Sequence, residues 1–182
     1  GGKRLDIVLL INGFPVAVGE VKTPTRSAIT WLDGAQDIND YEKSIPAMFV
    51  ANIFNFATEG KFYRYGSVCM PAAKWGPWHT TNDKSDGSLA AVQGSIQNMI
   101  TPEKVLDLFQ FFTLFATDSK YRKFKVIARY QQYEGANMIV DRVKNGYPKK
   151  GLIWHFQGSG KSYLMEFAAV KLRMLPSLSV SV

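Results

Sequence analysis

The sequence is poor in the residues that build disulfides and zinc sites. Its 182 residues include one cysteine, Cys69, and two histidines, His79 and His155. A single cysteine excludes an intramolecular disulfide. One cysteine and two histidines are also too few ligands for a Cys/His zinc site. The cytoplasm, which keeps thiols reduced, is therefore the expected compartment.

Long hydrophobic runs are also missing. Charged and amide side chains such as Asp6, Glu20 and Asn52 interrupt the apolar stretches, and none approaches the ~20 consecutive apolar residues of a spanning helix. We therefore expect no transmembrane helix. The first apolar run contains an acid and is followed by no small-residue cleavage site, so we expect no signal peptide, and the start resembles a cut end.

Acidic side chains are outnumbered by basic ones. The sequence has 22 Lys and Arg against 15 Asp and Glu, a formal net charge of +7. Such a surface favours polyanions, since contacts to phosphates contribute salt-dependent affinity. Many basic proteins never bind DNA, so the charge supports nucleic-acid binding without establishing it.

The hydrophobic pattern predicts a sheet that is interrupted by helices. Strand-like segments cover residues 5–11, 15–21, 48–56 and 61–65. Asn12-Gly13 separates the first two and predicts an antiparallel hairpin. Ser27 is the expected cap of a helix over residues 28–43, and residues 66–93 are expected to form a long surface loop.

A second part of the chain begins with another helix. Thr101-Pro102 followed by an acid is typical of a helix start, and the apolar stripe continues to residue 115. A basic stretch over residues 120–125 leads into a helix over residues 128–144. We predict an α/β protein with a first domain over residues 1–100, a linking helix over 101–120 and a second domain over 121–182.

Three polar residues interrupt the first two predicted strands. Glu20 and Lys22 share a face, because residues i and i+2 of a strand project to the same side. Two carboxylates, those of Asp6 and Glu20, can hold Mg²⁺ for phosphodiester hydrolysis, while the lysine orients the attacking water. The alternative is that all three are solvated residues of a strand edge. An unpaired charge in an apolar strand is costly, which favours the catalytic interpretation.

That interpretation constrains the register of the hairpin. Directly opposed residues of an antiparallel pair project to the same face. A regular two-residue turn would pair Ile11 with Phe14 and send Glu20 to the face opposite Asp6. We therefore predict a three-residue turn, or a bulge at Gly19, that sets Asp6 opposite Glu20.

A glycine-rich turn follows an apolar segment, expected to be a strand, over residues 151–156. It contains Gly158, Ser159, Gly160, Lys161 and Ser162 and leads into an amphipathic helix. In a phosphate-binding loop, backbone N–H groups surround the phosphates, the lysine reaches the β and γ phosphates, and the hydroxyl binds Mg²⁺. His155 stands where the general pattern has its first glycine. The alternative is a flexible turn before a helix, but the intact loop favours nucleotide binding.

Together these motifs resemble the R subunit of type I restriction enzymes, in which a PD-(D/E)xK nuclease precedes a superfamily 2 DNA translocase. The resemblance covers nearly the whole chain and rests on residues 6–13, 19–22, 128–133 and 151–162. It implies a mixed sheet flanked by helices in the nuclease domain and the truncated start of a RecA-like motor over residues 121–182. It also implies that Asp6 and Glu20 are metal ligands, Lys22 the catalytic lysine and Gln132 the adenine-reading residue.

The sequence departs from this family in two respects. The family has a glutamine four residues before a tyrosine on the helix after the catalytic strands, whereas Gln36 and Tyr41 are five apart. Five residues of helix rotate the tyrosine off the face of the glutamine unless the helix ends between them. No acidic motif that would hold Mg²⁺ for ATP hydrolysis follows Ser162, so we expect an incomplete motor.

The resemblance implies a type I site-specific deoxyribonuclease. Its Mg²⁺-dependent endonuclease would cleave double-stranded DNA as part of an ATP-driven translocase, with methyltransferase and specificity subunits as partners and no membrane association. The fragment by itself need not be active. The alternative is a nucleotide-dependent module that binds DNA without cleaving it, and a basic α/β interaction domain would require both motifs to be accidental.

Overall fold

A mixed four-stranded sheet forms the N-terminal half of the molecule, and its strands follow one another in the order β1-β2-β3-β4. The computed structural model describes residues 3–80 and 82–175. The strands are β1 (Ile7–Ile11), β2 (Phe14–Val21), β3 (Phe54–Thr58) and β4 (Tyr63–Gly66). β1 and β2 form an antiparallel hairpin, β2 and β3 are parallel, and β3 and β4 are antiparallel. The mixed α/β architecture expected from the sequence is present.

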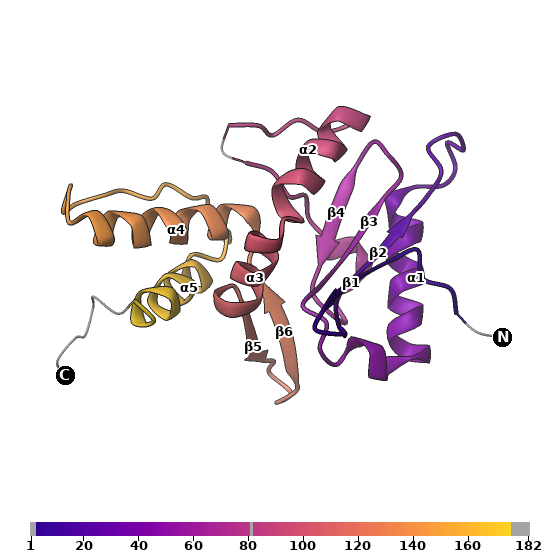
Figure 1. Cartoon of the computed structure of the whole chain (residues 1–182), viewed down its shortest axis with the longest axis horizontal. Coiled ribbons are helices and arrows are strands. Elements are labelled where there is room, and N and C mark those ends of the chain that lie inside the picture. Colours follow the sequence, from indigo (N-terminus) through magenta and orange to yellow (C-terminus); the bar gives the residue numbers. More distant parts are fainter. Residues whose placement is uncertain (1–2, 81, 176–182) are drawn as a thin grey trace.

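Helices cover both faces of this sheet (Figure 1). The parallel step from β2 to β3 needs a crossover, and helix α1 (Trp31–Ser44) provides it. Two short 3-10 turns, η1 (Pro46–Phe49) and η2 (Ala72–Lys74), flank the later strands. The remaining helices are α2 (Leu89–Met99), α3 (Pro102–Phe111), α4 (Tyr130–Asn145) and α5 (Lys161–Arg173).

Two apolar clusters hold these layers together. The cluster between α1 and the sheet includes Val18, Ile38 and Ala57. The cluster on the other face is larger and is rich in aromatic side chains. It extends from Phe56 of β3 to Phe167 of α5, so one continuous core connects the sheet to the last two helices. The domain boundaries predicted at residues 100 and 120 stay a prediction. One core runs across both positions, so the structure does not separate the proposed domains there.

The apolar stripe predicted to be helical up to residue 115 divides between a helix and a strand. α3 begins after its Thr101 cap as predicted, but it ends at Phe111. Strand β5 (Thr113–Thr117) follows and pairs with β6 (Lys123–Ile127), which contains part of the basic stretch. The buried Phe112 lies at the junction, and the threonines and the phenylalanine after it are residues that favour strands.

Three other local predictions were wrong. The strand expected over residues 48–56 is instead the 3-10 turn η1 followed by β3, which begins only at Phe54. α1 begins at Trp31 rather than at residue 28, because Thr30 forms a capping box with Asp33 instead of Ser27 acting as the cap. Residues 66–93 are not simply a surface loop, since Trp75 and Trp78 are buried in the two cores. α2 begins within this segment after a Ser88 cap.

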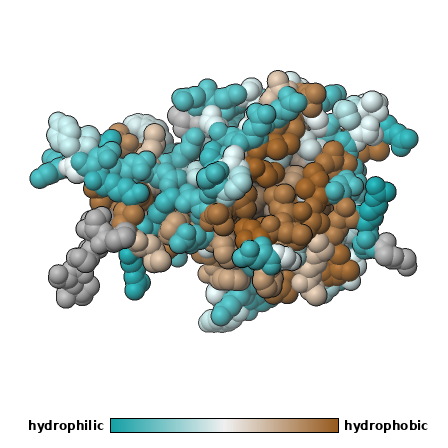
Figure 2. All heavy atoms as spheres, viewed as in Figure 1, coloured by the Kyte–Doolittle hydropathy of each residue, from teal (hydrophilic) through white to brown (hydrophobic). Residues whose placement is uncertain are grey.

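In the view of Figure 2, a broad hydrophobic area lies over the sheet. Side chains of the first hairpin contribute to the exposed apolar surface, among them those of Ile7, Phe14 and Val21. In the part of the chain that the structure describes, no helix has both the length and the apolar character needed to cross a membrane.

Candidate functional site

A bulge in the first hairpin brings Asp6 and Glu20 into register. The turn at Asn12-Gly13 has two residues and pairs Ile11 with Phe14, but Leu10 then pairs with Pro15 and Leu9 with Ala17. The extra residue is Val16, beside a proline that cannot donate to the ladder. Beyond the bulge the last pair of the ladder is Ile7 with Gly19, and Asp6 lies just before β1, where the same register continued by one residue would place it opposite Glu20. The predicted bulge is confirmed, although it lies near the turn and not at Gly19.

Glu20 is a buried carboxylate beneath α1. Its residue is 4% exposed, and Gly34 of α1 lies above it, where an added Cβ would be 3.4 Å from the Glu20 Cβ and Cγ atoms. Oε1 accepts a hydrogen bond of 3.0 Å from the Lys22 ammonium group. Oε2 is buried and has no partner among the described residues. Burial raises the pKa of the Glu20 carboxyl, and the hydrogen bond from Lys22 opposes that rise.

Lys22 lies between two carboxylates. Its Nζ atom is 3.0 Å from Glu20 Oε1 and 2.5 Å from Asp37 Oδ2. Partial burial lowers the pKa of Lys22, but the hydrogen bonds to Asp37 and Glu20 outweigh burial and raise it above its ordinary value. The ammonium group is therefore charged and fixed in place at neutral pH.

Asp6 lies just before β1, at the edge of this site. Its Oδ2 atom accepts a hydrogen bond of 3.0 Å from the Val21 N–H, and its charge is one of the influences that raise the pKa of Glu20. Within the described residues no group of three or more acidic, His or Cys side chains could hold a metal ion. Two carboxylates, one with an unpartnered buried oxygen, nevertheless fit Mg²⁺, which keeps several waters and often takes one or two protein carboxylates.

Helix α1 places Tyr41, but not Gln36, near this site. The helix is continuous across both residues, and Gln36 is exposed. Asp37 precedes Tyr41 by four residues, so these two share a face. Burial and the negative charges of Glu20 and Asp37 raise the pKa of Tyr41, whose hydroxyl donates to the Arg4 carbonyl at 3.3 Å. Asp37 therefore stands where the family pattern would place its glutamine.

The glycine-rich loop leads directly into helix α5. α5 begins at Lys161, directly after Gly160, whose φ of +80° is a left-handed conformation that favours glycine. The Ser159 hydroxyl oxygen is buried without a partner among the described residues. Lys161 Nζ folds back over the loop and donates to the carbonyls of His155 and Phe156 at 3.2 and 3.0 Å. Ser162 follows in the first turn of the helix.

Gln132 lies against this loop from the first turn of α4. Its residue is 4% exposed, and its side-chain amide contacts the carbonyls of Ser159 and Gly160. The structure thus brings Gln132 into contact with the loop. Its role in reading adenine stays a prediction.

The apolar segment before the loop is not a strand. Residues 151–156 have no regular structure, and Leu152 and Trp154 are 83% and 88% exposed. A fully apolar strand is stable when strands pair with it and helices cover it. No described strand pairs with this segment, which accounts for the wrong prediction.

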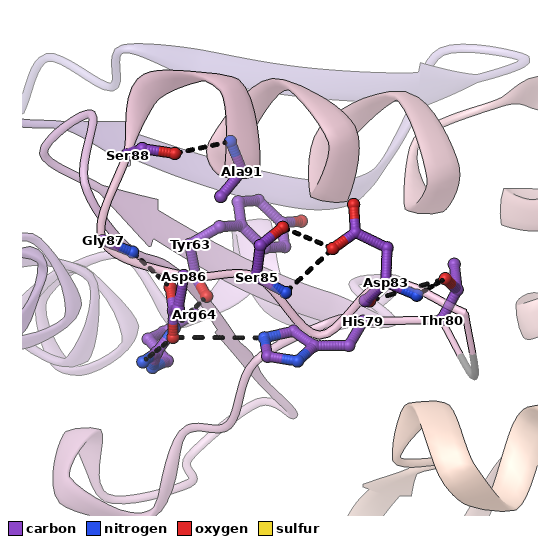
Figure 3. Close-up of polar contacts among 10 residues, drawn as sticks. All are labelled: Tyr63, Arg64, His79, Thr80, Asp83, Ser85, Asp86, Gly87, Ser88 and Ala91. Atoms are coloured by element: carbon purple, nitrogen blue, oxygen red, sulfur yellow. Dashed lines mark hydrogen bonds and ion pairs between the residues drawn. The ribbon is translucent and has the colours of Figure 1, made fainter.

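A second polar cluster joins the loop after β4 to the sheet (Figure 3). The Ser85 hydroxyl bonds to Asp83, whereas His79 Nε2 faces Asp86 Oδ2 at 4.0 Å. Arg64 of β4 binds the same Asp86 carboxylate with two hydrogen bonds, at 3.3 and 2.6 Å. Because the serine and the histidine have different partners, they do not form a nucleophile and base pair, and the cluster fastens the loop.

Two families and several proteins match the chain. Residues 1–73 match the family described as the type I restriction enzyme R protein N terminus, and residues 131–181 match the SWI2/SNF2 ATPase family. The HindI endonuclease subunit of a type I restriction enzyme from Haemophilus influenzae is 34% identical over 98% of this chain. Two Methanocaldococcus jannaschii proteins, named as the MjaVIIIP and MjaVIIP endonuclease subunits, are 30% and 34% identical over 90% and 91% of it. The chain spans 18%, 16% and 16% of the lengths of these three proteins.

Proposed function

Since the chain belongs to the R-subunit family of type I restriction enzymes and matches its N-terminal part, we propose that it carries a metal-dependent endonuclease that cleaves duplex DNA. The observation that carries this proposal is the buried Glu20 Oε2 atom, which has no partner among the described residues and lies next to Asp6 and Lys22. A buried carboxylate oxygen without a partner is costly, and a bound cation would satisfy it. The fold proposed for residues 1–100 is of the PD-(D/E)xK class.

Each residue of this site has a proposed role. Asp6 and Glu20 would hold Mg²⁺, which would supply Lewis-acid polarisation of a phosphoryl oxygen and a lower pKa for the attacking water. Lys22 supplies a fixed positive charge for the developing negative charge of the phosphodiester, or orients the water. Asp37 holds the lysine from the side opposite Glu20. The site therefore places its positive and negative groups before the substrate arrives.

The loop at Gly158, Ser159, Gly160, Lys161 and Ser162 is proposed to bind ATP as the start of a DNA translocase. The match to the SWI2/SNF2 ATPase family and the helix that begins at Lys161 support this assignment. Lys161 would exchange its two carbonyl partners for nucleotide phosphates, and the Ser162 hydroxyl would face Mg²⁺. Before nucleotide binds, the carbonyls of His155 and Phe156 hold the Lys161 ammonium group at the site.

The proposed partners are double-stranded DNA and the methyltransferase and specificity subunits of a restriction complex, and the proposed compartment is the cytoplasm. The similarity to endonuclease subunits of type I enzymes and the excess of basic residues support these assignments. Sequence recognition is assigned to the partner subunits, as the similarity to type I restriction enzymes implies.

Plasmid cleavage by the full-length protein, assembled with its partner subunits, tests the nuclease proposal. We expect cleavage only when a divalent cation is present, and we expect Glu20→Ala to abolish it. Asp40→Ala is the matched control, because Asp40 lies on α1 with its side chain 66% exposed and pairs only with Lys43 among the described residues. Cleavage that survives Glu20→Ala would contradict the proposal. Duplex binding without cleavage by the unaltered protein would instead favour a DNA-binding module.

A further inference from the structure

The excess positive charge of the chain lies entirely in its second part. Residues 113–182 contain 12 Lys and Arg against four Asp and Glu, whereas residues 1–112 contain 10 against 11. The part with the proposed nuclease site therefore contributes little long-range attraction for the phosphates of a duplex. Eight of the 12 basic residues fall in two short segments, residues 120–125 and 142–150. These two segments are the places to look for a contact with DNA.

The first of these segments forms part of the turn and of the second strand in the hairpin β5–β6, whose turn lies at the lower margin of the molecule in Figure 1. Asp118 organises this turn. Its Oδ1 atom accepts hydrogen bonds of 2.8 and 2.9 Å from the N–H groups of Lys120 and Arg122. Its Oδ2 atom accepts one of 2.9 Å from Arg122 Nε. These bonds order the backbone of the turn before any ligand binds.

The ammonium groups of Lys120 and Lys123 are available to a ligand at this turn. Both residues are exposed, and neither side chain has a partner among the described residues. Tyr121 between them is 91% exposed, and its φ of +60° is a left-handed conformation that is uncommon for residues other than glycine. Lysine and tyrosine side chains are among the groups that donate hydrogen bonds to DNA phosphates. The turn therefore presents three phosphate donors to the solvent.

The hairpin is fastened to the half of the molecule that contains the proposed nuclease site. Lys125 Nζ donates to the carbonyls of Val50 and Asn52 at 2.7 and 2.6 Å, so this lysine is used within the protein. At the base of the hairpin, the Tyr65 hydroxyl of β4 donates to the Ala128 carbonyl at 2.8 Å. A duplex bound at the turn would therefore be held at a fixed place relative to the sheet.

The second basic segment has no comparable framework. Residues 147–156, beyond the end of α4, contain no helix or strand, and the Arg142 guanidinium group already donates to the Lys150 carbonyl. A two-stranded ribbon, in contrast, has dimensions that the major groove of DNA admits. A segment that is ordered before binding also loses less conformational entropy when it binds. The hairpin is therefore the better matched of the two segments to a duplex.

We propose that the turn of the hairpin β5–β6 binds the phosphate backbone of duplex DNA through Lys120 and Lys123. This inference rests on the proposed function only in taking duplex DNA as the partner. Contacts to phosphates carry no sequence information, so the hairpin holds DNA of any sequence and leaves recognition to other parts of the complex.

Fluorescence anisotropy of a labelled duplex tests the proposal. The full-length protein is titrated at several salt concentrations, without a divalent cation and without nucleotide. The variant combines Lys120→Ala with Lys123→Ala. The matched control combines Lys149→Ala with Lys150→Ala, which removes the same charge from two exposed lysines of the other basic segment. Circular dichroism must be unchanged in both variants, because all four side chains lie on the surface.

We expect the hairpin variant to reduce the slope of log K against log salt by about 1.8, since each phosphate contact contributes about 0.9. At low salt, binding must weaken by about tenfold or more, and equally for two duplexes of unrelated sequence. The control must bind like the unaltered protein.

Three results would overturn the proposal: unchanged binding by the hairpin variant, equal losses in both variants, or a loss confined to the control. Equal losses would mean that affinity follows net charge alone. The nuclease proposal fails separately, through cleavage that survives Glu20→Ala, and binding without a divalent cation is measured independently of that outcome. If the unaltered protein bound no duplex, this inference would fall together with the proposed partner.

Discussion

Replacing Gly34 by alanine tests how closely α1 must approach the catalytic strands. The added Cβ would lie 3.2 Å from the Ala57 Cβ and 3.4 Å from the Glu20 Cβ and Cγ atoms, whereas carbon atoms prefer separations of ~3.5–4.0 Å. Both neighbours belong to strands of the sheet, so the helix must move outward. Alanine gains about 1 kcal/mol in helix propensity, and overpacking costs about 1–3 kcal/mol. We expect a net loss of roughly 1 kcal/mol in the free energy of unfolding.

Gly94→Ala is the matched control for this prediction. Gly94 lies within α2, and a Cβ atom built there meets nothing within 4 Å, so only the propensity gain of up to about 1 kcal/mol remains. Urea unfolding of the two variants must therefore give shifts of opposite sign. Cleavage by the Gly34 variant must also fall, because α1 carries Asp37 away from Lys22. Equal stabilisation by both substitutions would refute the close-approach argument.

Three further predictions concern single side chains. Asp37→Asn must lower kcat about tenfold, because an amide holds the Lys22 ammonium group more weakly than a carboxylate does. The free energy of unfolding must stay within about 0.5 kcal/mol of the unaltered protein, because the Asp37 side chain is 46% exposed. Equal cleavage rates for this variant and Asp40→Asn would argue against the role of Asp37. Glu42→Ala must destabilise the protein by about 2–4 kcal/mol in urea unfolding. The buried Glu42 carboxylate accepts hydrogen bonds from Asn55 Nδ2, the Cys69 N–H and Asn39 Nδ2, which would all lose this partner. A loss of stability below about 0.5 kcal/mol would contradict this network. Lys161→Ala in the full-length protein must abolish ATP hydrolysis and translocation and leave circular dichroism unchanged, and surviving ATPase activity would mean that the loop is only a turn.

Features set by neighbouring residues could be predicted from the sequence. The hairpin at Asn12-Gly13, the start of α3 after Thr101 and the helix start after Gly160 depend on turn and cap chemistry within a few positions. A bulge in the hairpin could also be predicted, because the catalytic interpretation requires Asp6 and Glu20 on one face. The position of the bulge could not be predicted, since Gly19 and the Pro15 region are both suited to irregular pairing.

Features set by contacts between distant segments could not be predicted in this way. Asp37 reaches Lys22 from a helix fifteen positions away, and on the sequence it is one of several acids on that helix. Its only signal was its place four residues before Tyr41. The buried tryptophans at positions 75 and 78 stand among prolines and glycines that indicate a loop, and only the tertiary core explains their burial.

Anomalous diffraction from crystals soaked in Mn²⁺ tests most directly whether Asp6 and Glu20 together bind a divalent cation. We expect an anomalous peak between the two carboxylates, next to the Glu20 Oε2 atom that has no partner among the described residues. The same crystals of Glu20→Gln should lose the peak. A map without a peak, in crystals where both carboxylates are ordered and unblocked, would contradict the catalytic assignment.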